Sequence, residues 1–102
     1  MSKRFLEKLP SRFKNDIEKA IELLKYEGCT EIFIFGSLAV GNYNDQSDID
    51  IAVKGLQLNK FYEVGGKLLF LLDNNFDLIR LDDEQSNFAK LVQKNQVLIR
   101  VA

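Results

Sequence analysis

The chain has 102 residues, of which 46% are hydrophobic and 28% charged, and its formal net charge is −1. This length suits one domain, and the hydrophobic content excludes an intrinsically disordered chain. A nearly neutral charge argues against a surface that follows long nucleic acid, because such surfaces are usually basic. We therefore expect a single domain over residues 1–102 that does not bind long nucleic acid.

The residue types that are missing limit the chemistry further. Histidine is absent and Cys29 is the single cysteine, which excludes an internal disulfide, a cysteine-built zinc site and a histidine general base. An enzyme with this sequence must rely on carboxylates, hydroxyls, backbone amides and hard cations. The apolar runs are shorter than the ~20 residues that span a bilayer. Because no apolar segment follows the basic residues near the start, we expect a cytoplasmic protein that does not enter the membrane.

Hydrophobic spacing predicts alternating helices and strands. Apolar residues at three- and four-residue intervals indicate helices, and short β-branched or aromatic runs bounded by turn formers indicate strands. The predicted helices are residues 11–27, 38–41, 60–72 and 83–95. The predicted strands are residues 31–35, 48–53, 76–81 and 96–101, the last being a strand or an extended tail. This order predicts an α+β (α/β) fold in which helices flank a small mixed sheet, and we expect them to pack on one side of it.

Gly36 and Ser37 follow directly after the predicted strand 31–35. Glycine permits a close approach by a ligand, and the amides and hydroxyl that follow it can bind an anion such as phosphate. A Gly-Ser pair by itself is more often a plain turn, so this feature needs support from elsewhere in the sequence.

Asp48 and Asp50 lie two residues apart in the predicted strand 48–53, where alternation places both side chains on one face of the sheet. Neighbouring carboxylates repel each other, and oxygen ligands of this kind suit Mg²⁺ or Mn²⁺. Asp77 lies in the next predicted strand and can join them if the two strands pair. Three carboxylates can hold two cations for phosphoryl chemistry. Taken singly, each aspartate is more simply explained as an ordinary loop or strand residue.

Ten residues separate Ser37 from Asp48, which gives the pattern Gly-Ser-X10-Asp-X-Asp with a later acid at Asp77. This pattern resembles the signature of the nucleotidyltransferase superfamily that includes DNA polymerase β. The short chain looks like the smallest members of that superfamily, the minimal nucleotidyltransferases (MNT proteins). The resemblance covers nearly the whole chain, and it implies the nucleotidyltransferase fold.

The resemblance also implies a role for each residue of the pattern. Gly36 and Ser37 would hold the β- and γ-phosphates of ATP or another nucleoside triphosphate. Asp48 and Asp50 would bind two Mg²⁺ ions, with Mn²⁺ as the alternative. Asp77 would bind the ion nearest the attacking hydroxyl. The chain would then be a metal-dependent nucleotidyltransferase, and ATP is favoured by the resemblance alone because no base-reading pattern is visible.

The family also implies a partner. MNT proteins form complexes with a small helical protein of the HEPN or substrate-binding type. In some pairs the MNT protein is an antitoxin that adds AMP to a tyrosine of its toxin, and in others the helical subunit completes the active site. The resemblance therefore implies transfer of AMP to a hydroxyl on a partner protein or a small molecule.

The sequence departs from the family at three positions that are often basic, which here are Leu38, Val40 and Asn44. Their loss removes helpers for the triphosphate and the leaving pyrophosphate. Lys54 and Lys67 are candidate replacements. The alternative function is a catalytically weak or inactive binding module that neutralises or regulates a helical partner by complex formation.

Two smaller features leave alternatives open. Tyr43 can stack on a base or lie in a surface turn. The apolar residues near both ends of the chain either cover the core or form an interface, and a dimer or hetero-oligomer is expected. These terminal residues are Phe5, Leu6, Leu9, Val97, Leu98, Ile99 and Val101.

Overall fold

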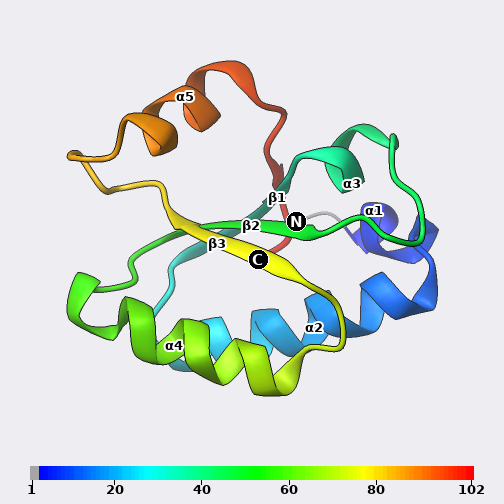
Figure 1. Ribbon diagram of the computed structural model, residues 1–102, viewed down its shortest axis with the longest axis horizontal. Coiled ribbons are helices and arrows are strands. Elements are labelled where there is room, and N and C mark those ends of the chain that lie inside the picture. The colour runs from blue at the N-terminus through cyan, green and yellow to red at the C-terminus, as the bar shows by residue number, and fades with distance from the viewer. Residues whose placement is uncertain (1–2) are drawn as a thin grey trace.

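Four strands form one sheet in the computed structural model, which describes residues 3–102 (Figure 1). The strands are β1 (Glu31–Phe35), β2 (Ile49–Lys54), β3 (Phe76–Arg80) and β4 (Ile99–Arg100). Their order across the sheet is β3-β2-β1-β4. β1 runs antiparallel to both β2 and β4, whereas β2 and β3 are parallel. The predicted mixed sheet is therefore confirmed, and β2 and β3 pair, which is the condition for Asp77 to lie beside the other aspartates.

Within the described part of the chain, five helices connect and cover these strands. They are α1 (Lys3–Lys8), α2 (Ser11–Tyr26), α3 (Ser37–Val40), α4 (Leu58–Leu71) and α5 (Asn87–Asn95). The sequence analysis did not predict α1, and it started the last helix at residue 83. That helix begins later because Ser86 caps it, with the Ser86 hydroxyl accepting a 3.1 Å hydrogen bond from the Ala89 N–H. None of the helices within residues 3–102 combines the length and apolarity needed to cross a membrane.

The helices cover both faces of the sheet, and Figure 1 shows α2 and α4 below it and α5 above it. Ile32 and Ile34 of β1 point into the main core with residues of α2 and α4. Phe33 and Phe35, which alternate with them, belong to a second apolar cluster with Val92 of α5. The expectation that the helices pack on one side is therefore wrong for α5. Because β1 is apolar on both faces, each face needs a cover.

Helix α2 begins at residue 11 as predicted and ends at Tyr26, one residue before the predicted end. Gly28 has a φ of +104°, and its N–H and that of Cys29 donate to the carbonyls of Lys25 and Leu24. This pair of bonds is a Schellman motif, which explains why glycine follows the helix. Pro10 occupies the position before the first helical residue, Ser11. A proline there suits the extended backbone at this point.

The apolar ends of the chain cover the core. Leu6, Leu9 and Val101 are buried within the main core cluster, and Phe5 packs against it. Leu98 packs on the second cluster, whereas Val97 is exposed. Of the two explanations for these residues, covering the core is the one that the structure supports.

A buried carboxylate fixes the connection between α4 and β3. Asp16 of α2 is 1% exposed and accepts hydrogen bonds from the backbone N–H groups of Asp73 and Asn74, the latter at 2.8 Å. The side-chain amide of Asn74 donates to the same carboxylate at 2.7 Å. Because β3 begins two residues later, Asp16 determines where Asp77 lies.

Candidate active site

The turn after β1 brings its backbone against β2. Gly36 has φ +72° and ψ −150°, a conformation that side-chain-bearing residues rarely adopt. A Cβ atom at this position would overlap Oδ2 of Asp50. The four-residue helix α3 begins immediately afterwards at Ser37. Glycine is therefore required at position 36 both for the turn and for the close approach of the Asp50 carboxylate.

Asp50 and Asp77 lie opposite each other in neighbouring parallel strands. Asp50 also pairs with Phe35 of β1, so the carboxylate lies one residue from the Gly36 turn. Asp50 is partly buried, and Asp77 is exposed. The pairing of β2 with β3 thus places Asp77 beside Asp50, on the sheet face that also carries Ala52 and α5.

The electrostatics of this pair are unfavourable for two negative charges. The pKa of Asp50 is raised from 3.8 to about 6, first because the group is desolvated by burial and then because of the Asp77 charge. A hydrogen bond shared with Asp77 and the charge of Asp48 raise it further. A carboxyl group held in this way gains from a cation or a proton placed between the two side chains.

Asp48 lies just before β2 and is exposed, so the strand is one residue shorter than predicted at this end. Its charge nevertheless acts on Asp50. Within the described residues 3–102, no three Asp, Glu, His or Cys side chains already stand in an arrangement that could hold a metal ion. The oxygen-only donor set and the repulsion around Asp50 suit a hard divalent cation. The fold thus brings Asp50 and Asp77 together, and Asp48 is close enough for its charge to act on Asp50.

The proposed replacements for the missing basic residues do not reach this site. Lys54 lies at the opposite end of β2 from Asp50, and its ammonium is 3.9 Å from Glu31. Lys67 lies on α4, on the other side of the sheet, and bonds Glu27 at 2.7 Å. The hypothesis that these lysines replace the lost charges is therefore wrong. Strand alternation places Lys54 on the same face as Asp50 but four residues further along β2, whereas no sequence signal indicates the side of the sheet on which Lys67 lies.

The three departures from the family differ in their surroundings. Leu38 is fully buried in the main core, so the packing excludes a basic side chain at this position. Val40 is exposed at the end of α3. Asn44 shapes its own loop, because its side-chain oxygen accepts a hydrogen bond from the Gln46 N–H at 2.8 Å.

The sequence analysis missed Arg12, a basic residue near the aspartates. The Arg12 guanidinium donates to the side-chain oxygen of Asn74 at 2.8 Å and lies 3.8 Å from the Asp45 carboxylate. Arg12 lines a polar pocket of about 460 Å³ together with Asp48 and with residues of the loop before β2 and of the loop before β3. Only the packing of α2 against these loops brings Arg12 here, so no local sequence signal indicates it.

The environment of Tyr43 is neither a surface turn nor a base-stacking site. Its ring is partly buried against the main core and meets the Phe13 ring edge-on, with centroids 5.8 Å apart. Its ring thus anchors the loop before Asp48 to α2.

Comparisons with known proteins found one family model and several similar structures. A family model described as "Polymerase beta, Nucleotidyltransferase" matches residues 15–101, a range that contains all four strands. The chain is similar to a crystal structure of a toxin–antitoxin with AMP-PNP, at 30% identity and a TM-score of 0.62, over 82% of this chain and 71% of that one. It is also similar to a mutant of the toxin–antitoxin MntA-HpeT, at 27% identity and a TM-score of 0.58, over 79% and 69% of the two chains. A search of curated protein sequences found no significant match.

Proposed function

Because the chain belongs to the polymerase beta nucleotidyltransferase family and has its fold, we propose that it transfers AMP from ATP to a hydroxyl on a partner protein or a small molecule. The observation that carries this proposal is the pairing of Asp50 with Asp77 directly against the Gly36 turn. The AMP-PNP bound in a similar structure supports an adenine nucleotide as the donor.

In this proposal the turn after β1 binds the triphosphate. Gly36 has no side chain, so phosphate oxygens can approach the backbone at the start of α3. The Ser37 hydroxyl and the amides that follow would donate to the β- and γ-phosphates. The α-phosphate would then lie towards the carboxylates on β2 and β3.

The three aspartates would hold the cations that the reaction needs. Asp48 and Asp50 would bind two Mg²⁺ ions, with Mn²⁺ as the alternative, and Asp77 would share the one nearest the acceptor. Bound cations would neutralise charge on the triphosphate and favour deprotonation of the acceptor hydroxyl. A variant of the similar MntA-HpeT complex carries two Asp→Glu substitutions two residues apart, which is the spacing of Asp48 and Asp50 here.

The chemistry is an in-line displacement at the α-phosphorus. The acceptor oxygen forms a bond to that phosphorus, while the bond to the bridging oxygen of the pyrophosphate breaks. The hydroxyl proton passes to the Asp77 carboxylate, and the pyrophosphate leaves with the bonding electron pair. The products are an adenylylated acceptor and pyrophosphate.

The similar structures support a proposal for the acceptor and the setting. Both are toxin–antitoxin complexes, which supports a partner protein for this chain too. We propose that this partner is a small helical protein of the HEPN type, for which the chain acts as antitoxin or catalytic subunit in the cytoplasm.

Transfer of label tests this proposal. The chain is purified together with a HEPN-type helical protein as the proposed partner and incubated with Mg²⁺ and α-labelled ATP. Label should appear on the partner, and Asp48→Asn combined with Asp50→Asn should abolish it. Asp45→Asn, a change at an exposed position of the same loop, is the matched control and should label normally. Equal labelling by the double variant would contradict the proposal.

A second candidate, a binding module without catalysis, is favoured by the burial of Leu38 and by the distant ion pairs of Lys54 and Lys67. Such a module would neutralise its partner by covering it. The double aspartate variant, without nucleotide, would then inhibit the partner as well as wild type does. An increase in partner mass by one AMP that requires the intact aspartates would exclude this candidate.

A further inference from the structure

Helix α4 is apolar on both its inner and its outer side. Val64 and Leu68 point into the main core. On the other side, Tyr62, Leu69 and Phe70 are 82%, 73% and 94% exposed. Exposed apolar side chains that gather in one patch mark an interaction surface. The outer side of α4 is therefore suited to being covered, although the exposed charged residues Glu63 and Lys67 lie on the same helix.

The neighbouring helix shows the contrast. The exposed side of α2 carries charged residues, among them Glu18, Lys19, Glu22 and Lys25. Both helices cover the same face of the sheet, as Figure 1 shows. Of the two, α2 has an outer surface suited to water, whereas much of the outer surface of α4 is apolar.

Two glycines in the middle of α4 point to the same conclusion. Gly65 and Gly66 weaken the helix relative to alanine, yet a Cβ atom on either would meet nothing within 4 Å. Packing within this chain therefore does not require them. Gly66 lies four residues from Tyr62 and four from Phe70, so all three occupy the same side of the helix. This side presents a gap between two projecting aromatic rings.

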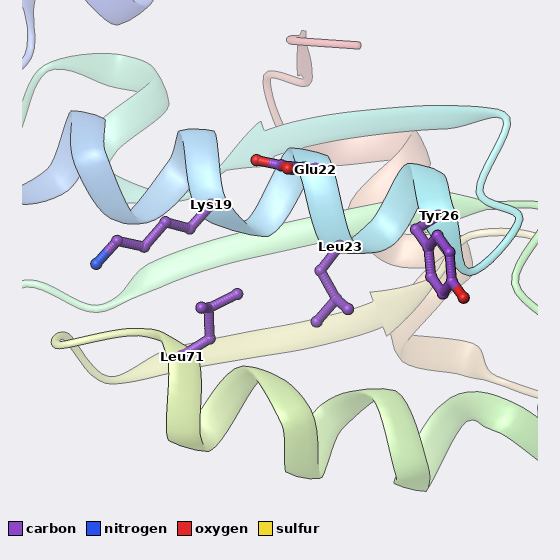
Figure 2. Close-up of a pocket in the computed structure, with 5 residues that line it drawn as sticks. All are labelled: Lys19, Glu22, Leu23, Tyr26 and Leu71. Carbon is purple, nitrogen blue, oxygen red and sulfur yellow. The ribbon is translucent and has the colours of Figure 1, made fainter.

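The apolar surface continues towards α2. Figure 2 shows Leu23 and Tyr26 of α2 and Leu71 of α4 along a groove between the two helices, with a volume of about 380 Å³. Tyr26 is 84% exposed. The groove is also lined by Lys19 and Glu22, and the Lys67–Glu27 ion pair lies beside Tyr26, so Tyr26 is not counted with the outer side of α4.

Fully exposed aromatic side chains present about 150–250 Å² each, so Tyr62 and Phe70 together with the exposed leucines of α4 present on the order of 600 Å². This area is at the lower end of what one partner of a standard protein interface buries, and at the upper end of the largest apolar patch of a typical monomer, which is about 300–600 Å².

We propose that a second copy of this chain covers the outer side of α4, in a symmetric dimer whose two-fold axis passes at Gly66. Antiparallel α4 helices related by this axis bring Gly66 against Gly66, which allows a close approach. Tyr62 of each copy then lies opposite Phe70 of the other, because both residues are four positions from the axis. A symmetric interface requires such self-complementarity, whereas a different protein would not.

The proposed interface leaves the candidate active site open. α4 covers the face of the sheet opposite to the one that carries Asp50 and α5. The dimer therefore does not depend on the proposed function, and an acceptor can still reach both sites.

Molar mass in solution tests the dimer. Light scattering of the full chain at concentrations up to about 200 µM, well above the Kd expected for an interface of this size, should give twice the 11.7 kDa of one chain. Phe70→Glu should give the mass of one chain with an unchanged circular dichroism spectrum, because the ring is almost fully exposed. Phe88→Glu, at an exposed aromatic on α5, is the matched control and should remain dimeric.

The variant Gly66→Ala distinguishes a role of Gly66 in the dimer interface from a role within its own helix. Alanine favours the helix, so the isolated chain should become more stable, while the added methyl groups at the axis should weaken dimerisation at least tenfold. A wild-type chain that is monomeric throughout the concentration range would overturn the proposal and leave this surface to a different protein. A dimeric Phe70→Glu variant would also overturn it.

Discussion

A Cβ atom on Gly36 would overlap the Oδ2 atom of Asp50, so these two residues can stand together only while position 36 has no side chain. The contact joins the end of β1 to the beginning of β2, where Phe35 and Asp50 are register partners. The candidate phosphate-binding turn and the central carboxylate are thus parts of one packed unit.

Gly36→Ala should therefore lose both stability and nucleotide binding. The positive φ alone costs about 1–3 kcal/mol for alanine, and the methyl group also displaces the Asp50 carboxylate. Urea unfolding and AMP-PNP titration measure the two effects. Gly41→Ala is the matched control, since Gly41 has a φ of +80° but open space at its Cβ position, and it should cost only about 1–2 kcal/mol. AMP-PNP binding to Gly36→Ala with wild-type affinity would contradict the prediction.

Asp50→Asn should stabilise the metal-free protein at neutral pH. The pKa of Asp50 is raised from 3.8 to about 6 by burial and by Asp77, so the folded chain binds more protons than the unfolded chain between these values. Its contribution to the free energy of unfolding is therefore present below about pH 4 and falls as the pH rises through 6. Asparagine avoids this loss, and the gain should be on the order of 1 kcal/mol after allowance for solvent screening.

Urea unfolding of wild type and Asp50→Asn between about pH 4 and 7.5 measures this dependence, with Asp45→Asn as the control at an exposed position. The unfolding free energies of wild type and Asp50→Asn should converge at the acid end of this pH range. If Asp50→Asn raises the free energy of unfolding by the same amount at every pH, the charge of Asp50 is not the cause of the gain.

Asp16→Ala should destabilise the fold by about 2–4 kcal/mol, because it leaves the N–H groups of Asp73 and Asn74 without their acceptor. Thermal unfolding gives the change, and it should be accompanied by weaker nucleotide binding since β3 carries Asp77. Asp73→Ala is the matched control. It keeps the backbone N–H that Asp16 binds and removes only an exposed side chain, so it should behave like wild type.

Cys29 should resist alkylation in the folded protein. Its side chain is buried, and burial together with the charges of Asp82 and Glu27 raises the pKa of the thiol to about 11. Near pH 8 only about one molecule in a thousand then carries the reactive thiolate. Iodoacetamide labelling followed by mass spectrometry should therefore be fast only in urea, and rapid labelling without denaturant would contradict the burial of this residue.

Where local sequence determines the structure, the sequence analysis was accurate. The bounds of β1 were predicted without error, because a β-branched and aromatic run is followed by a glycine that must have a positive φ. The pairing of β2 with β3 also follows from sequence, since both are short apolar runs joined by a helix. Helix α1 was missed because its six residues are too few to show a period.

Features that depend on tertiary packing were not predictable in the same way. The contact between Gly36 and Asp50 needs the register of β1 with β2, which no local signal provides. Arg12 and the burial of Leu38 likewise follow from how α2 and α3 pack. The roles of Gly36, Ser37, Asp48, Asp50 and Asp77 in nucleotide and metal binding remain predictions that the variants above test.

The antiparallel ladder between β1 and β2 has a consequence for the length of the segment that joins them. Pairing of Phe35 with Asp50 in this ladder holds the two ends of the segment together whatever lies between. Doubling the length of a flexible connection costs only about 0.6 kcal/mol in closure entropy. Insertions around the exposed Asp45 should therefore be tolerated, and relatives with longer or shorter spacers can keep the same arrangement of turn and carboxylates.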